Sequence, residues 1–260
     1  MPGYDPRLFE VLFDAEDRHF WFRARNRVLA VVARSVVSRL ADGYRVLELG
    51  CGDGNTLRML DEACARGTLV GMDLFADGLQ YARRRTRAPL VCGSMDRPPF
   101  RARFQLVGMF DVLEHLEDDR TALCRVRELV EPGGTLLLTV PADQRLWSRF
   151  DEESHHCRRY QLRDLESRLT DAGFKVEFVT PFMVALYPLA RVGRKVSDWL
   201  RGAKARLGLP PGSAVASETR VRPVINGLLS VILSPEARFI RRRRRLPFGT
   251  SLLAVARLPE

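Results

Sequence analysis

Short apolar runs alternate with amphipathic stretches along most of this chain, a pattern typical of α/β proteins. Helical spacing of apolar residues predicts helices at 27–41, 55–64, 77–85, 123–130 and 162–172. Short runs rich in valine, leucine and other apolar residues predict strands at 45–49, 68–73, 89–92, 104–110, 135–140, 174–180 and 251–256. Because strands alternate with helices, we expect a doubly wound, seven-stranded α/β sheet with helices on both faces.

Residues 1–27 form a segment with an unusual cluster of aromatic side chains. Phe20, Trp21 and Phe22 are adjacent in the sequence, and three adjacent side chains cannot all lie on one stripe of a helix. Some of them must pack elsewhere, so we expect this segment to fold over the rest of the chain as a lid. A helix docked on the edge of the sheet is the alternative.

Residues 181–249 separate the last two predicted strands, a span too long for a structureless loop in a compact domain. Apolar stripes predict helices at 183–200 and 221–240, joined by a link at 209–217 that contains Pro210-Pro211-Gly212. We therefore expect three parts: a lid at 1–27, a core at 28–180 and 250–260, and a mainly helical insert at 181–249. The insert comes before the last strand and is expected to cap a substrate pocket.

A glycine-rich turn follows the first predicted strand. Gly50, Gly52 and Gly54 permit positive φ angles and leave room for a ligand where side chains would stand. The helix that follows points its free N–H groups at the same place, which favours a polar or anionic ligand. A tight strand–helix turn without any ligand has the same pattern. The next strand ends on Asp73, 25 residues after Glu48, where nucleotide-binding sheets carry an acid that accepts ribose hydroxyls.

Four motifs occur in order: ELGCGDG at 48–54, GMD at 71–73, FDVLEH at 110–115 and EPGG at 131–134. Together they resemble the class I S-adenosylmethionine-dependent methyltransferases, over roughly residues 28–180 and 250–258. The resemblance implies a Rossmann-like sheet, S-adenosylmethionine as cofactor and transfer of a methyl group. The dehydrogenase fingerprint would place its third glycine at position 55, whereas this chain has it at position 54, and this spacing disfavours NAD.

The resemblance also implies where the cofactor contacts lie. Asp73 would clasp the ribose, and Arg23 or Arg25 would meet the cofactor carboxylate beneath the lid aromatics. The cofactor-binding set that we expect is Trp21, Arg25, Glu48, Gly50, Gly52, Gly54, Asp73, Leu74, Ser94, Met95, Phe110 and Asp111.

The loop at 93–100 departs from the pattern of the family. Ser94 stands where the family often carries an acid that meets the adenine amino group. We therefore expect the backbone of Met95, assisted by Ser94 or Asp96, to make that contact.

Three histidines are candidate catalytic residues. His115 follows Asp111 by one helical turn at the end of the fourth strand, where ligands of open α/β sheets bind. His155 and His156 lie in the long connection at 141–160, in a segment that resembles the substrate mouth of bacterial methyltransferases of this kind. A hydroxyl acceptor needs a base, and histidine titrates near neutral pH. The alternatives are a packed His115 without a proton role and a solvated loop around His155 and His156, and no spacing here is diagnostic of a metal site, so none is expected.

The amino-acid composition limits the cellular compartment and the partners that we expect for this protein. The 260 residues have a net charge of +10, which suits nucleic acid, an anionic membrane, an acidic substrate or only an arginine-rich genome. Five scattered cysteines without a paired motif indicate reduced thiols, and no segment resembles a secretory signal, so we expect a cytoplasmic protein. No apolar run reaches the roughly 18 residues that span a bilayer.

The expected function is methyl transfer to a small, apolar or lipid-like metabolite, with O-methylation favoured. The basic run Arg241–Arg245 at the end of the insert makes peripheral contact with the inner membrane surface a second expectation. An RNA methyltransferase, which only the charge supports, and a non-catalytic protein that binds S-adenosylmethionine are the alternatives. Nucleic acid is not expected as a partner, and the sequence leaves the oligomeric state open.

Overall fold

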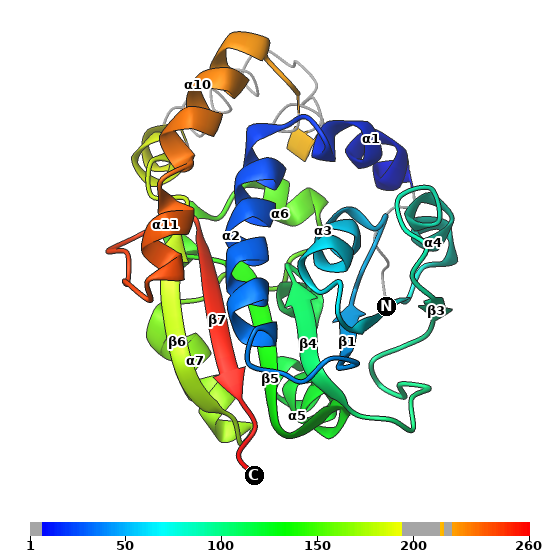
Figure 1. Ribbon diagram of the computed structural model, residues 1–260. Helices are drawn as coiled ribbons and strands as arrows, with labels where there is room; N and C mark the ends of the chain where they lie inside the picture. The colour runs from blue at the N-terminus through cyan, green and yellow to red at the C-terminus, as the bar shows by residue number, and fades with distance from the viewer. Residues whose placement is uncertain (1–6, 194–213, 216–219) are drawn as a thin grey trace.

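A seven-stranded mixed sheet runs through the molecule (Figure 1) in the order β3-β2-β1-β4-β5-β7-β6. The computed structural model describes residues 7–193, 214–215 and 220–260. The strands are β1 (Arg45–Leu49), β2 (Thr68–Asp73), β3 (Leu90–Cys92), β4 (Phe104–Phe110), β5 (Val130–Pro141), β6 (Lys175–Phe182) and β7 (Ser251–Arg257). Strands β1 to β5 pair in parallel, and β7 lies antiparallel between β5 and β6. The predicted α/β fold is confirmed.

Helices cover both faces of the sheet. The helices are α1 (Arg7–Glu16), α2 (Phe20–Val37), α3 (Asn55–Ala63), α4 (Ala76–Ala82), α5 (Asp119–Leu129), α6 (Arg149–Glu153), α7 (Leu162–Asp171), α10 (Pro223–Leu233) and α11 (Glu236–Arg241), with 3-10 turns η1 (Leu113–His115) and η2 (Gln144–Leu146). One core joins α2, α3 and α11 to the near face in Figure 1 through residues such as Leu29, Leu60 and Ile240. The other joins α5 and α7 to the opposite face through residues such as Leu123 and Leu165.

Three predicted element bounds were wrong. Helix α2 runs from Phe20 to Val37 without a break, so the helix predicted at 27–41 begins seven residues earlier, within the segment 1–27 that we expect to act as a lid. The predicted helix at 221–240 is two helices, α10 and α11, because Pro235 cannot continue the hydrogen-bond ladder of a helix. Strand β5 begins at Val130, since this residue already pairs with Phe104 ahead of the glycine pair.

Parts of the predicted insert lie outside the described residues. This applies to most of the link at 209–217 and to the second half of the helix predicted at 183–200. Where the chain is described, no helix is both long enough and apolar enough to cross a membrane.

The described part of the insert holds the start of α2 in place. Asn226 on α10 accepts a hydrogen bond from the backbone N–H of Phe20 (2.6 Å), and its amide donates to the carbonyl of Arg18 (2.9 Å). Glu236 on α11 accepts the backbone N–H groups of Met183 (2.7 Å) and Val184 (2.8 Å), which fixes the chain just after β6. Helices α10 and α11 both pack against α2, so the insert supports the segment that precedes the core.

Asn226→Ala should therefore destabilise the protein. Asn226 caps the first turn of α2 from another helix, and loss of a capping acceptor costs about 1 kcal/mol. We expect a decrease of about that size in the free energy of unfolding, measured by denaturant titration. Val224→Ala truncates an exposed side chain on the same helix and should lose much less. Equal losses in the two variants would contradict the capping role.

Candidate active site

A cavity of about 1000 Å³ lies at the carboxyl ends of β1, β2 and β4, below α1 and the start of α2. Thirteen of the fifteen site residues predicted from the sequence line it: Trp21, Arg25, Gly50, Gly52, Asp73, Leu74, Ser94, Met95, Phe110, Asp111, His115, His155 and His156. The structure thus brings together side chains from the first half of the core and from the connection after β5. Glu48 and Gly54 are not among the lining residues.

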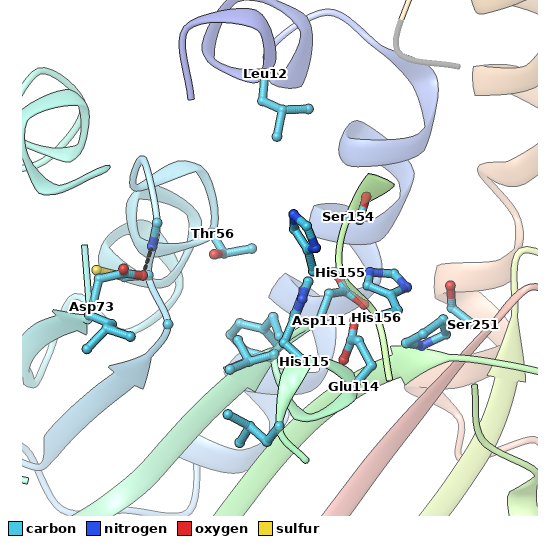
Figure 2. A pocket seen from close by; sticks show the side chains of 18 of the residues that line it. Leu12, Thr56, Asp73, Asp111, Glu114, His115, Ser154, His155, His156 and Ser251 are labelled. Carbon is cyan, nitrogen blue, oxygen red and sulfur yellow. Dashed lines mark hydrogen bonds between the residues drawn. The ribbon is translucent and has the colours of Figure 1, made fainter. Parts of the chain in front are cut away.

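Asp73 is fixed at the end of β2 by the glycine turn. Its Oδ2 accepts the backbone N–H of Gly52 (2.7 Å), shown as a dashed line in Figure 2, and its Oδ1 accepts that of Phe75 (2.9 Å). Gly52 has a φ of 51° and Gly50 a φ of 71°, angles that favour glycine. Burial raises the pKa of Asp73, and the hydrogen bonds from Phe75 and Gly52 oppose that shift. Each carboxylate oxygen keeps a further lone pair for a ligand hydroxyl.

Glu48 lies beneath the turn rather than on the cavity wall. It is fully buried, and its Oε1 accepts a hydrogen bond from the hydroxyl of Thr56. Burial raises the pKa of Glu48 to about 8. Gly54 is also structural here: its φ is 83°, and a Cβ at this position would come within 2.9 Å of the Cα of Ala82 on α4. These two residues shape the turn that holds Asp73.

Arg25 points from α2 toward the end of β4. Its Nη1 donates to Oδ2 of Asp111 (2.8 Å), and its guanidinium lies 5.0 Å from the centre of the Trp21 ring. The side chain of Arg25 is buried, whereas Arg23 is exposed and does not line the cavity. Asp111 has a φ of 55° and also accepts the hydroxyl of Thr139 (3.2 Å). Of the two arginines that the sequence offered, Arg25 is the one on the cavity.

A buried arginine that the sequence reasoning missed ties α1 to the glycine turn. The Nη1 of Arg85 lies 2.7 Å from carboxylate oxygens of both Glu16 and Asp53, and its side chain is 2% exposed. Burial raises the pKa of Glu16, and the nearby Asp53 adds to the shift. Because Asp53 belongs to the glycine motif, this cluster connects the segment over the cavity directly to the turn below it.

The histidines gather at the other end of the cavity from Asp73 (Figure 2). The rings of His115 and His156 meet edge to face, with centroids 4.7 Å apart. Burial lowers the pKa of His115 to about 3, and the neighbouring His156 adds to the shift. His155 is exposed at the rim, with a φ of 56°. The predicted helical turn from Asp111 to His115 is in fact the short 3-10 turn η1.

A buried carboxylate orients His156. Asp151 lies 2.9 Å from Nδ1 of His156 and accepts two hydrogen bonds from Arg159, at 2.8 and 3.1 Å. Burial would raise the pKa of Asp151, but the hydrogen bonds from His156 and Arg159 and the charge of Arg159 lower it to about 2. Asp151 is therefore ionised near neutral pH, and Nδ1 of His156 serves as the donor. The Nε2 atom of His156 is left with its lone pair.

The segment from Cys157 to Tyr160 joins the two sequence-distant parts of this cluster. The N–H of Cys157 donates to the carbonyl of Glu114 (2.7 Å), and the guanidinium of Arg158 donates to the carbonyls of Leu116 and Glu117. Tyr160 is buried and its hydroxyl donates to Asp119 (2.8 Å). These contacts seat the connection after β5 on η1 and set the positions of its histidines.

Sequence reasoning missed Glu114, Asp151 and Arg159 as members of the site. Glu114 stands next to His115 in the FDVLEH motif, and Arg159 lies in the basic run that follows His156. Their positions beside the predicted histidines were the only clue in the sequence that these residues belong to the site. The clue is weak because only the fold shows that the two segments meet.

Glu48→Gln should reduce the dependence of stability on pH. The folded-state pKa of Glu48 is raised from 4.5 to about 8, so its contribution to stability is full below about pH 4.5 and is lost as the pH rises through about 8. In the wild type we expect the free energy of unfolding, measured by denaturant titration, to fall between about pH 5 and about pH 9. In this variant the fall should be smaller by a few kcal/mol. Glu62→Gln, at an exposed position of α3, is the control and should behave like the wild type. Identical pH profiles for all three would refute the buried, proton-binding state of Glu48.

Comparison with known proteins gives the family. A profile described as "Methyltransferase domain" matches residues 13–178. A probable S-adenosylmethionine-dependent methyltransferase of Mycolicibacterium smegmatis is 28% identical over 165 residues, which cover 62% of each chain. Trans-aconitate 2-methyltransferase of an Azoarcus species is 29% identical over 165 residues, 60% of each chain. The chain thus matches about three fifths of the length of these curated relatives.

Solved structures share the fold. The plantazolicin methyltransferase BpumL, solved with S-adenosylhomocysteine, superposes with a TM-score of 0.59 at 12% identity, over 98% of this chain and 90% of that one. A methyltransferase of Haloferax volcanii in complex with the activator Trm112 superposes with a TM-score of 0.58 at 21% identity, over 94% and 92% of the two chains.

The cofactor of this family is S-adenosylmethionine, and the cavity residues fit it. The fixed carboxylate of Asp73 suits ribose hydroxyls, the buried Arg25 supplies a cation for a carboxylate, and the cavity is large enough for a nucleoside and a second molecule. The motifs, the sheet order and the matched profile agree. The chain belongs to the class I S-adenosylmethionine-dependent methyltransferases.

Proposed function

We propose that the protein transfers a methyl group from S-adenosylmethionine to an oxygen atom of a small, largely apolar acceptor. The observation that carries this proposal is the division of the cavity: Asp73 stands at one end, and the cluster of Glu114, His115 and His156 stands at the other (Figure 2). A nucleoside cofactor that extends from Asp73 leaves the histidine end for the acceptor. Positioning of donor and acceptor is then the main contribution of the enzyme.

The chemistry of the walls supports an apolar acceptor. The residues around the histidine end include Phe22, Leu116, Leu146, Phe150 and Val215. Polar groups such as Glu114, Ser154 and Ser251 line the same end, so an acceptor with an oxygen among these groups and an apolar body against the other side chains fits best. Two curated relatives, trans-aconitate 2-methyltransferase and malonyl-[acyl-carrier protein] O-methyltransferase, are named for small-molecule or carrier-bound acceptors that carry carboxylates. They support a small acceptor with an oxygen that can be methylated, whereas the apolar body is inferred from the cavity lining alone.

His156 is the histidine that we place nearest the acceptor oxygen. Bound S-adenosylmethionine supplies an electrophilic methyl group on a sulfonium. Asp151 holds Nδ1 of His156, which leaves a lone pair on Nε2 to draw the proton from an acceptor hydroxyl. His115 is neutral near pH 7, because burial lowers its pKa to about 3, and it packs against His156. His155, at the rim, is the weakest candidate of the three.

The other expected partners stay predictions. Contact with a membrane surface is favoured by one observation: α10 exposes Val224, Leu228 and Val231, and the chain continues through α11 into the arginine run Arg241–Arg245. A cytoplasmic location stays a prediction, and RNA methylation stays the alternative function. The family model and the named methyltransferase relatives disfavour cofactor binding without catalysis.

Asp73→Ala should weaken cofactor binding by about 10- to 100-fold, because hydrogen bonds to a charged group contribute about 1.5–3 kcal/mol. Isothermal titration calorimetry with S-adenosylmethionine measures this change. Asp77→Ala removes an exposed acid four residues away on α4 and should keep the affinity of the wild type. Unchanged affinity in Asp73→Ala would remove the ribose contact from the account.

His156→Ala should lower turnover by about 10²- to 10⁴-fold, the usual contribution of a positioned proton acceptor, and leave cofactor affinity near that of the wild type. The acceptor is found first, by transfer of a labelled methyl group into fractions of a cell extract and mass analysis of the product. Initial rates with that acceptor then measure the effect. Full turnover in the variant would show that His156 does not serve the reaction, and a labelled RNA instead of a small product would contradict the proposed acceptor class.

A further inference from the structure

We propose that Glu114, His115 and His156 bind a divalent transition-metal ion in the acceptor half of the cavity. Each residue offers one ligand atom, and these atoms all lie within 4.8 Å of one another. One carboxylate oxygen and two imidazole nitrogens are a common ligand set for zinc, manganese and iron(II). The sequence predicted no metal site, because Glu114 and His115 lie 41 or more residues from His156 and no spacing shows that they meet.

The first independent observation is the state of Glu114. Its side chain is fully buried, and neither carboxyl oxygen has a hydrogen-bond partner in another described residue. Buried carboxylates are costly unless they are paired or coordinate a metal. Neither of the nearby arginines donates to Glu114, since Arg25 donates to Asp111 and Arg159 donates to Asp151. A bound cation supplies the partner that Glu114 otherwise lacks.

The second observation is the support behind His156. Asp151 holds Nδ1 of His156, as a carboxylate behind a metal-binding histidine does, and Arg159 in turn holds Asp151. This pairing fixes the tautomer and the orientation of the His156 imidazole. The ring of His115 packs edge to face against that imidazole, with centroids 4.7 Å apart.

The ligand atoms have to draw together around an ion. Two ligands that each lie about 2.1 Å from one ion at a tetrahedral angle are about 3.4 Å apart. The three ligand atoms lie within 4.8 Å of one another, so the largest separation has to shorten by at most about 1.4 Å, which side-chain rotation can supply. Three protein ligands leave open positions on the ion, and all three residues line the cavity that the proposed acceptor would occupy.

A cation at this place would also take part in the proposed methyl transfer, and this consequence rests on the proposed function. An acceptor hydroxyl that joined the ion would have a lower pKa and would lose its proton more readily. His156 would then act as a ligand, and solvent would carry the proton away. The site favours acceptors whose methylated oxygen can approach a metal, such as phenols, enols and carboxylates.

Cobalt(II) binding to the chelator-treated, tag-free protein tests the site. The protein used for these measurements, called the background protein, carries Cys157→Ser, which removes an exposed thiol that could bind metal by itself. We expect saturable binding of one ion per chain, seen in the visible absorption of cobalt(II), and displacement of that ion by zinc. Glu114→Gln and His156→Ala should each abolish saturable binding, and the matched control His155→Ala should retain it. Retained calorimetric binding of S-adenosylmethionine shows that each variant is folded.

Two outcomes would overturn the proposal. One is the absence of stoichiometric cobalt binding by the folded background protein. The other is binding that survives both Glu114→Gln and His156→Ala, since the ion would then lie elsewhere. Neither readout needs an acceptor, so failure of the metal site and failure of the proposed methyl transfer are told apart. Turnover that is unchanged after chelation would leave the methyltransferase proposal intact and remove the proposed role of the ion in the reaction.

Discussion

The site depends on a carboxylate held by backbone N–H groups at the end of a parallel strand. Asp73 can stay on the cavity wall because Gly52 and Phe75 donate to both of its oxygens. The donor at position 52 faces Asp73 only because the glycine turn takes positive φ angles, and that turn rests on the buried Glu48–Thr56 pair. The result is an acid whose position is fixed before any ligand arrives, which lowers the cost of binding.

The two halves of the cavity are connected through the end of β4. Asp111 pairs with Arg25 on the cofactor side, and Glu114 follows one turn later on the acceptor side. The connection after β5 is seated on the same turn by the N–H of Cys157. Helix α2, which carries Arg25, is in turn capped by Asn226 of the insert. A change in the insert can therefore reach the cofactor side through one helix.

The sequence predicted what depends on local pattern. Strands β1, β2 and β4 have the predicted bounds, and the glycine turn and Asp73 lie where the motif spacing placed them. It did not predict contacts between distant segments: Arg85 with Glu16 and Asp53, or Asp151 behind His156. A periodic pattern reports which face of an element is apolar, and it carries no information on which charged side chains meet across the fold. For the same reason the sequence did not show that the side chain of Glu48 is buried under the turn and does not line the cavity.

The most direct test of the central claim is a crystal structure of the protein with S-adenosylhomocysteine. The account predicts both ribose hydroxyls within hydrogen-bond distance of the Asp73 carboxylate, about 2.7 Å, while the N–H of Gly52 still donates to it. The homocysteine carboxylate should lie near Arg25, and the sulfur should point toward His156. A nucleoside bound at the histidine end, or a ribose with no contact to Asp73, would contradict the account.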